Sequence, residues 1–472
     1  MAIAPQFVLC LLFLVSMAKP RTLYFCQQCG QQSAKWVGKC PSCGQWNTFV
    51  EEVIDREAEK GKEKRPVYHD REVKPRLLDE IEAEESVRIN TRDPELNRVL
   101  GGGIVPGSLV LIGGEPGIGK STLLLQIGLQ LEGFRVLYVS GEESEVQIRL
   151  RARRIGKEAP HFYLLTETHT QSILKHCKEL EPDVLVIDSI QTLYTAFIES
   201  PPGSVSQVRE CAAELQRFAK ETHTPVFIIG HVTKDGSLAG PKVLEHVVDT
   251  VLQFEGDSSN QFRILRSTKN RFGSASELGI YEMMSSGLRP VQNPSELLLT
   301  QRTDAFSGIA VGAMIEGQRP LMIEVQALVA PAFYGTPQRS ATGFDPRRLH
   351  MLLAVLEKRC GFRLGTQDVF LNIAGGLRVD DPALDLAVVS AIVSSHEDAP
   401  LSMQHAFAAE VGLSGEIRNV GRLEQRIDEA EKLGFTRIFV SSAARTMESR
   451  PRQIEVVMLE KVQDLISYIL RR

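Results

Sequence analysis

The sequence predicts an α/β protein, and two observations support this fold class. Short apolar runs bounded by turn residues recur at 108–112, 135–139, 184–187 and 226–229, a pattern typical of strands buried on both faces. Longer stretches with helical periodicity lie between these runs. Because strands that alternate with helices form βαβ units, we expect a parallel sheet.

A second α/β region follows a stretch rich in Gly, Pro and Ser at 285–294, which interrupts the first pattern. Its alternation again indicates a sheet covered by helices. The expected strands are 310–315, 321–329, 369–373, 408–411 and 437–440, and the expected helices are 346–359, 382–395 and 424–433.

Length and composition indicate a globular protein of about three domains, at about 150 residues each. The chain has 472 residues, of which 43% are hydrophobic and 24% charged. The net charge of −5 does not indicate a general nucleic-acid binder, so any DNA contact must come from local basic patches. The expected divisions are an upstream extension at 1–16, a Cys-rich module at 17–50, a charged linker at 51–76, and α/β domains at 77–290 and 291–472.

Cysteine usage indicates a reducing, cytoplasmic compartment. Four of the eight cysteines cluster between Cys26 and Cys43, and the other four are scattered singly. The apolar run 7–16 resembles the core of a signal peptide, but no Lys or Arg precedes it. It is also too short to span a bilayer. We therefore expect Met17 to be the start and no association with a membrane.

Residues 114–121 match the phosphate-binding pattern GxxxxGK[ST] in full. The octet follows an apolar strand and precedes a helical pattern at 122–131, which is the context that the motif requires. Lys120 should reach the β- and γ-phosphates of ATP, and the Ser121 hydroxyl should bind Mg²⁺. The predicted nucleotide-binding residues are Gly114, Glu115, Pro116, Gly117, Ile118, Gly119, Lys120, Ser121 and Thr122.

Three further residues complete the predicted hydrolytic site. Asp188 ends the apolar run 184–187, as a carboxylate that holds Mg²⁺ would. Glu142 ends the strand that follows the phosphate-loop helix, where RecA-like folds place the carboxylate that activates water; Glu143 is the alternative. His231 follows the strand 226–229 and is the expected sensor of the γ-phosphate, although a lone histidine is usually structural.

Two CxxC pairs, Cys26 with Cys29 and Cys40 with Cys43, indicate a Cys₄ zinc site. Each pair is followed by a glycine, which allows the tight turn that directs two thiolates at one ion. A closed Cys₄ site has no open position, so one structural Zn²⁺ is expected; a redox-active CxxC is the alternative. Trp36 and Trp46 belong either to the core of this module or to a base-stacking surface.

These motifs, together with Lys269-Asn270-Arg271-Phe272-Gly273, resemble the bacterial RadA family of DNA-repair ATPases from Met17 to the C-terminus. The resemblance implies a DNA-stimulated ATPase that processes recombination intermediates and promotes branch migration of RecA-made joints. It also implies a hexameric ring that acts on single-stranded and branched DNA, with RecA recombinase and a replicative helicase as partners.

The KNRFG motif also has a physical interpretation. In a ring ATPase, a cation of one subunit can reach the γ-phosphate held by its neighbour, as an arginine finger does. Lys269 and Arg271 suit this role, and the alternative is a solvated basic turn.

The C-terminal half resembles the proteolytic domain of Lon, whose site needs a serine nucleophile and an activating lysine. In the matching segments Ala383 stands in place of the serine, and Glu424 stands roughly in place of the lysine. We therefore expect a scaffold domain without peptidase activity, in preference to an ATP-dependent protease.

Basic residues of two regions are candidates for DNA contact, with a solvated surface patch as the alternative. The alternative function is a nucleotide-switched DNA-binding adaptor with little turnover. The candidates are Lys234 and Lys242 after His231, and Arg339, Arg347 and Arg348 in the C-terminal region.

Overall fold

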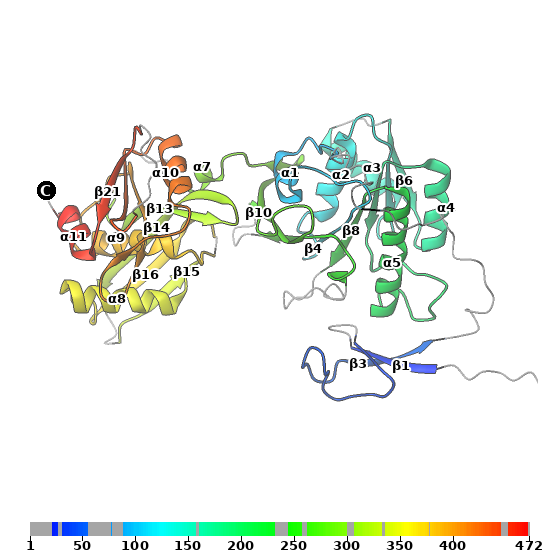
Figure 1. Ribbon diagram of the computed structural model, residues 1–472, viewed down its shortest axis with the longest axis horizontal. Helices are drawn as coiled ribbons and strands as arrows, with labels where there is room; N and C mark the ends of the chain where they lie inside the picture. The colour runs from blue at the N-terminus through cyan, green and yellow to red at the C-terminus, as the bar shows by residue number, and fades with distance from the viewer. Residues whose placement is uncertain are drawn as a thin grey trace, which may run out of the picture.

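The computed structural model describes residues 21–26, 31–54, 77, 88–156, 160–231, 244–256, 262–299, 306–332, 336–376, 378–444 and 452–470. Three bodies are visible, each with its own sheet: a small N-terminal module in blue, a central domain in cyan and green, and a C-terminal domain in yellow to red (Figure 1). The predicted α/β class is confirmed, but the expected extension at 1–16, residues 55–76 of the expected linker, Lys234 and Lys242 lie outside the described residues.

The central domain is built on a nine-stranded sheet with the order β12-β11-β10-β9-β4-β8-β7-β5-β6. Six of its strands, from β9 to β6 in that order, run parallel to one another. Their bounds are β4 (Leu109–Gly114), β5 (Val136–Ser140), β6 (Phe162–Thr166), β7 (Val184–Asp188), β8 (Val226–His231) and β9 (Thr250–Gly256). The four inner strands β4, β5, β7 and β8 are mostly apolar, as expected for strands with both faces covered.

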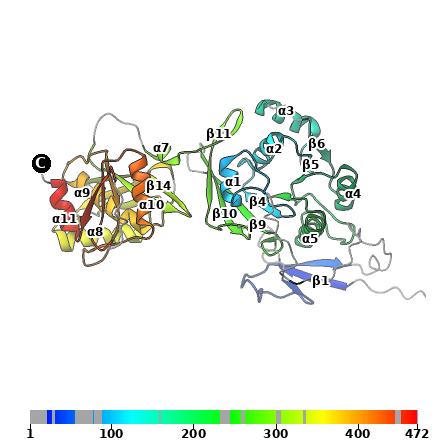
Figure 2. The same cartoon turned by 45° about the horizontal axis from the view of Figure 1, so that its top comes forward.

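The expected parallel sheet is present, and antiparallel strands that the sequence analysis did not predict extend it on one side. Strands β10 (Phe262–Asn270), β11 (Leu278–Met284) and β12 (Gly287–Pro290) extend the sheet beyond β9 in antiparallel fashion. Too few residues separate these strands to hold a crossover helix, so hairpin pairing is the available solution. Residues 285–290, in the stretch expected to separate the two α/β regions, form the turn between β11 and β12 and the strand β12 itself. The antiparallel extension lies between the two large domains in Figure 2.

Helices cover both faces of the nine-stranded sheet. Side chains of α1 and α2 join one apolar core with Val110, Tyr138 and Val186, and α3 packs at its margin. Side chains of α4 and α5 form a second core with Leu111 and Ile187 on the opposite face. The helices are α1 (Pro94–Leu100), α2 (Lys120–Gln130), α3 (Glu145–Ile155), α4 (Thr170–Leu180) and α5 (Val205–Thr222).

The C-terminal domain has a seven-stranded mixed sheet in the order β15-β16-β14-β13-β17-β20-β21. Strands β13 and β14 form a long antiparallel hairpin at the centre of this sheet. Beyond β13, the strands β17, β20 and β21 run parallel to it. The strands are β13 (Ile309–Glu316), β14 (Arg319–Pro331), β15 (Arg339–Thr342), β16 (Gln367–Ile373), β17 (His405–Ala408), β20 (Arg437–Ser441) and β21 (Glu455–Leu459).

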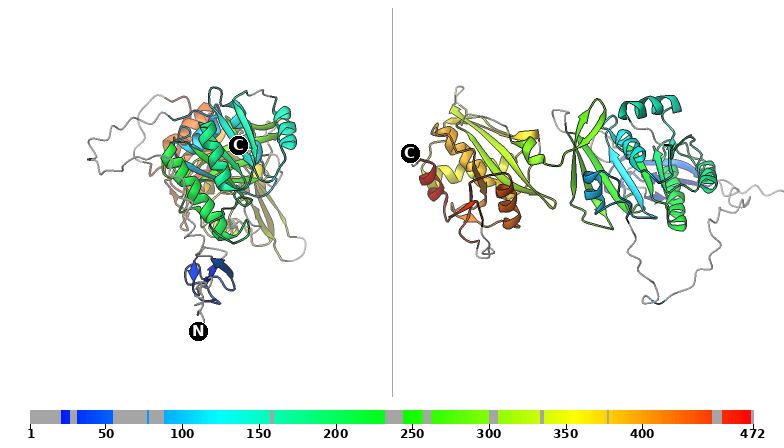
Figure 3. Two further views of the ribbon diagram at one scale, coloured as in Figure 1. Left: turned by 90° about the vertical axis from the view of Figure 1, so that its right-hand side faces the viewer. Right: turned by 90° about the horizontal axis from the view of Figure 1, so that it is seen from above.

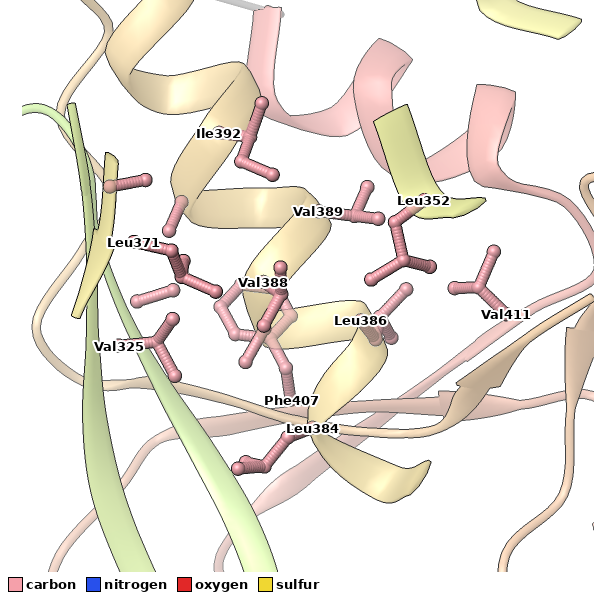
Figure 4. Close-up of a cluster of buried hydrophobic side chains, with 14 of the residues drawn as sticks. Val325, Leu352, Leu371, Leu384, Leu386, Val388, Val389, Ile392, Phe407 and Val411 are labelled. Atoms are coloured by element: carbon pink, nitrogen blue, oxygen red, sulfur yellow. The ribbon is translucent and has the colours of Figure 1, made fainter. Parts of the chain in front are cut away.

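The larger core of this domain surrounds α9, whose Leu386, Val389 and Ile392 lie among side chains of the sheet and of α8 (Figure 4). A smaller core lies under α10 on the other face of the sheet. The helices are α7 (Pro294–Leu298), α8 (Pro346–Cys360), α9 (Asp385–His396), α10 (Leu423–Lys432) and α11 (Val462–Leu470), and a 3₁₀ turn (Pro382–Leu384) precedes α9.

The predicted strand 408–411 is two strands in the structure. Residue 408 ends β17, while β18 (Glu410–Val411) pairs with β19 (Ile417–Arg418) in a separate ribbon. A short run of four residues does not show a change of sheet, because either arrangement can bury its apolar side chains.

Charged side chains join the two large domains. Glu95 of α1 accepts a hydrogen bond from Arg319 of β14 at 2.7 Å, and both side chains are buried. Arg266 of β10 forms an ion pair with Glu316 of β13. The view from above in Figure 3 shows the β10–β12 region facing the C-terminal domain. None of the described helices combines the length and apolar character that a membrane span requires.

Candidate ATP-hydrolysing site

The phosphate loop joins β4 to α2 at the carboxyl edge of the nine-stranded sheet. Gly117 and Gly119 have positive φ angles of 78° and 117°, a conformation that costs glycine little. Gly119 is the N-cap residue of α2, and no side chain caps this end of the helix. The N–H groups of the first helical turn are therefore available to bind an anion. The Lys120 amine donates to the carbonyls of Gly114 at 2.8 Å and Glu115 at 2.9 Å.

Asp188 ends β7 beside this loop, with its side chain buried. It accepts a hydrogen bond from the Tyr138 hydroxyl at 2.5 Å and another from Ser121. Burial raises the pKa of Asp188, and hydrogen bonds from Tyr138 and Ser121 oppose that rise. A buried carboxylate beside a serine hydroxyl is a suitable pair of oxygen ligands for Mg²⁺.

Glu142 follows β5 by two residues, and its charge, like that of Asp188, acts on Lys120. It accepts hydrogen bonds from His231 Nε2 at 2.9 Å and from the Ser189 hydroxyl. The hydrogen bond from His231, with that from Ser189, lowers the pKa of Glu142 despite partial burial. Glu142 is therefore ionised at neutral pH and able to accept a proton from water or to orient it.

The two neighbouring glutamates differ in their partners. Glu143 is ion-paired with Arg151 of α3, whereas Glu142 is bonded to His231 and Ser189. His231 places Nδ1 3.4 Å from the Lys120 amine and Nε2 against Glu142, so it bridges the cation and the carboxylate. This geometry favours Glu142 over Glu143 as the base and puts His231 where it can respond to a γ-phosphate.

The residues of the loop suit a nucleotide with Mg²⁺. Burial lowers the pKa of Lys120, and the nearby carboxylates of Asp188 and Glu142 oppose this shift. One cation, two carboxylates and a row of backbone N–H groups thus converge on one edge of the sheet. The residues expected to bind ATP are those of the loop, and those expected to hold Mg²⁺ are Ser121 and Asp188.

Two residues of this site escaped the sequence analysis. Ser189 follows Asp188 directly, so its place was visible in the sequence, but its bond to Glu142 depends on how two strands end. Tyr138 lies within an apolar strand, and nothing in the sequence distinguishes it from a core residue.

The KNRFG motif lies at the opposite end of the sheet. Asn270 pairs with Thr250 at the beginning of β9, and the backbone of Arg271 donates to Asp249 O at 3.2 Å. The Arg271 side chain is half exposed and 3.4 Å from the Asp249 carboxylate. Lys269 donates to the backbone carbonyls of Glu245 and Val248. The length of β4, about 17 Å at about 3.3 Å per residue, separates this end from the phosphate loop of the same chain.

The N-terminal module brings three of the four predicted zinc ligands together. Its sheet consists of β1 (Arg21–Cys26), β2 (Gln32–Ser33) and β3 (Phe49–Ile54). The sulfurs of Cys26, Cys40 and Cys43 all lie within 4.8 Å of one another, and Cys29 lies outside the described residues. Cys26 Sγ and Cys43 Sγ are 3.7 Å apart. Two thiolates bound tetrahedrally to zinc at about 2.3 Å are about 3.8 Å apart, so the spacing suits a Zn²⁺ ion.

The candidate DNA-contacting residues of the C-terminal domain have different surroundings. Arg347 is exposed at the first turn of α8, and Arg339 is partly exposed on the edge strand β15. Arg348 forms a two-pronged ion pair with the fully buried Asp385, which raises the pKa of the guanidinium. Arg348 thus has a structural role that its sequence context did not show.

At the segments that resemble Lon, the structure shows an ion pair in the interior. Ala383 is fully buried in the turn before α9, and Glu424 lies 3.7 Å from Arg452. Between the two segments, Arg426 donates to Asp381 at 2.7 Å and to the carbonyl of Ala313 at 2.8 Å. The charges of Arg426 and Asp381 therefore neutralise each other.

Comparison with protein families divides the chain in the same way. Residues 24–51 match a model described as a rubredoxin metal binding domain, residues 74–237 match an AAA domain, and residues 336–444 match the subunit ChlI of Mg-chelatase. The central domain is therefore a RecA-like ATPase domain, preceded by a zinc ribbon and followed by a ChlI- and Lon-like domain.

Curated relatives cover nearly the whole chain. The DNA repair protein RadA of Bacillus subtilis is 50% identical over 95% of this chain and 99% of its own length. The RadA protein of Halalkalibacterium halodurans is 49% identical over 97% of this chain and 100% of its own length. Among solved structures, the RadB recombinase aligns over 43% of this chain and 100% of its own, with 24% identity and a TM-score of 0.36.

Proposed function

This chain belongs to the RadA family of DNA repair proteins, and we propose that it is a DNA-stimulated ATPase that promotes branch migration at recombination intermediates. The family and the AAA domain support a DNA-repair ATPase. Stimulation by DNA and movement on single-stranded or branched DNA are the proposal. RecA recombinase and a replicative helicase are the proposed protein partners, in keeping with the family resemblance.

The observation that carries this proposal is the separation of the two sets of charged residues. Lys120, Asp188 and Glu142 form a site that can bind and hydrolyse ATP within one subunit. Arg271 lies about 17 Å from that loop, so it can meet a γ-phosphate only in a neighbouring subunit. A ring, proposed to be hexameric, supplies such a neighbour and makes turnover depend on assembly.

Hydrolysis in this site follows from the roles of its side chains. Bound Mg-ATP supplies the phosphoanhydride bond that is cleaved. Lys120 and the loop N–H groups bind the phosphate oxygens, and Ser121 and Asp188 hold Mg²⁺. Glu142 orients a water molecule and accepts its proton, and its bonds to His231 and Ser189 keep the carboxylate in place.

DNA contact is proposed for surfaces outside this site. Arg339 and Arg347 can bind phosphates without recognising sequence, as can Lys234 and Lys242. The rings of Trp36 and Trp46 are largely exposed, and Lys39 Nζ lies 5.6 Å from the Trp46 ring centre. Both tryptophans are therefore accessible for stacking on unpaired bases.

The decisive experiment measures ATP turnover by the full chain with and without single-stranded DNA, together with branch migration of a RecA-made joint. Stimulation of turnover and ATP-dependent migration are expected. Binding of DNA with little turnover in either condition would instead support a nucleotide-switched adaptor. Degradation of casein that survives rigorous purification would support the protease alternative.

A further inference from the structure

One buried arginine, which belongs to none of the sequence motifs, touches the phosphate loop from the first part of β10. Arg263 lies on β10 and is 7% exposed. Its Nε donates to the carbonyl of Ile118 at 3.0 Å, and its Nη1 donates to the carbonyl of Phe262 at 2.8 Å. Within the described part of the chain, no ion pair joins Arg263 to a carboxylate. A charge that is buried without a counter-ion is costly, so a functional reason for it is expected.

The geometry of the peptide unit supplies that reason. In a trans peptide the carbonyl and the following N–H point in opposite directions. Fixing the Ile118 carbonyl toward β10 therefore fixes the Gly119 N–H in the opposite direction, toward the inside of the loop. Gly119 has a φ of 117°, a backbone angle that residues with a side chain rarely adopt. The peptide between Ile118 and Gly119 can therefore rotate more freely unless another group holds it.

Met283 of the antiparallel extension and Phe254 of β9 also lie against the loop. A Cβ at Gly119 would lie 3.1 Å from Met283 and 3.2 Å from Phe254, and one at Gly114 would lie 2.7 Å from the carbonyl of Phe254. These contacts limit how far the loop can move, but all of them are steric. Arg263 makes the directional contact, because a charged donor selects one orientation of the carbonyl.

We propose that Arg263 is a positioning residue that holds the phosphate loop in its nucleotide-binding conformation through the Ile118 carbonyl. This inference rests on the ATP site proposed above and adds a residue from β10 to it. Arg263 acts in two ways: it orients the Gly119 N–H before the nucleotide arrives, and its positive charge lies beside a loop that receives an anion. Both effects favour binding of the nucleotide more than the chemical step.

The test measures the affinity of the full chain for a fluorescent ADP analogue, with steady-state ATP hydrolysis beside it. R263Q is expected to weaken binding by about tenfold to a hundredfold, the range for losing a hydrogen bond to a charged donor. The KM for ATP should rise by a similar factor, while kcat changes less. R263K keeps the charge and one donor, so it should recover part of the affinity. R289Q is the matched control, because Arg289 is an exposed arginine of the same extension, paired with Glu282.

The outcomes separate this inference from the function on which it rests. If the unaltered chain binds no ADP analogue, the ATP site itself is wrong. If the unaltered chain binds and R263Q binds within about twofold of it, Arg263 does not position the loop. Thermal unfolding of each variant shows whether the domain has folded. If R263Q does not fold, R263K decides: affinity equal to that of the unaltered chain would overturn the proposal.

Discussion

The two large domains both carry charged side chains in their interiors, and they use them in opposite ways. In the C-terminal domain, Asp385 at the start of α9 is paired with Arg348, and Asp381, which lies just before α9, is paired with Arg426. Each carboxylate is therefore neutralised by a guanidinium group of the same domain. At the carboxyl edge of the central sheet, the Lys120 amine is bonded to backbone carbonyls and Asp188 to hydroxyl groups.

This difference is the one expected between a site that binds ligands and a site whose charges serve stability. A buried pair with matched charges is complete, and breaking it costs stability. A set of charges that is held by neutral groups keeps its capacity for an anion and a metal ion. In the C-terminal domain, the carboxylates at the segments that resemble Lon are thus paired with guanidinium groups, and four predictions test that contrast.

The largest effect is expected for Lys120→Ala. This change removes the cation that the phosphates need, so ATP turnover should be abolished. The measurement is phosphate release at saturating ATP. Turnover equal to that of the unaltered chain would refute the assignment of the ATP site.

Arg271→Ala should retain nucleotide binding but lose DNA-stimulated turnover by about 10³-fold, the typical effect of removing a trans-acting finger. Nucleotide affinity, ATPase rates with and without DNA, and ring assembly by light scattering are measured together. Retained stimulation with retained branch migration would contradict the coupling role. Lost nucleotide binding would place Arg271 in the ground-state site instead.

Arg348→Met tests the paired charges of the C-terminal domain. It leaves Asp385 buried without its partner, which should destabilise that domain by about 3 kcal/mol in denaturant unfolding. Arg347→Met, at the exposed neighbouring position, is the control and should change stability by less than about 0.5 kcal/mol. Equal effects of the two changes would mean that the ion pair does not stabilise the domain.

The smallest effect concerns a buried carboxylate of the central domain that is held by neutral groups. Glu214 accepts hydrogen bonds from Gln171 and Thr195, and burial raises its pKa from 4.5 to about 7. An acid with a raised pKa favours the folded state at low pH, and this contribution is lost as the pH rises from about 4.5 to above 7. Glu214→Gln should therefore reduce the loss of stability between pH 5 and pH 8 by about 2 kcal/mol. If the stability of Glu214→Gln depends on pH as that of the unaltered chain does, Glu214 does not titrate in this range.

The sequence by itself determined the fold class and the main parts of the ATP site. The phosphate loop, the apolar strand ending at Asp188 and the pairs of cysteines are local patterns, because chemistry and backbone conformation fix their spacing along the chain. The pattern of buried strands likewise follows from local periodicity. The alternation of strands and helices also predicted two α/β domains.

Tertiary structure alone decided which distant side chains meet. The antiparallel strands β10–β12 were missed because apolar runs do not reveal the direction of pairing. Arg263 contacts the phosphate loop only because β10 pairs with β9. Arg348 has the sequence context of a surface cation, but the fold brings it to Asp385. In each case the partner is far away in the sequence, and such contacts depend on how the strands and helices pack together.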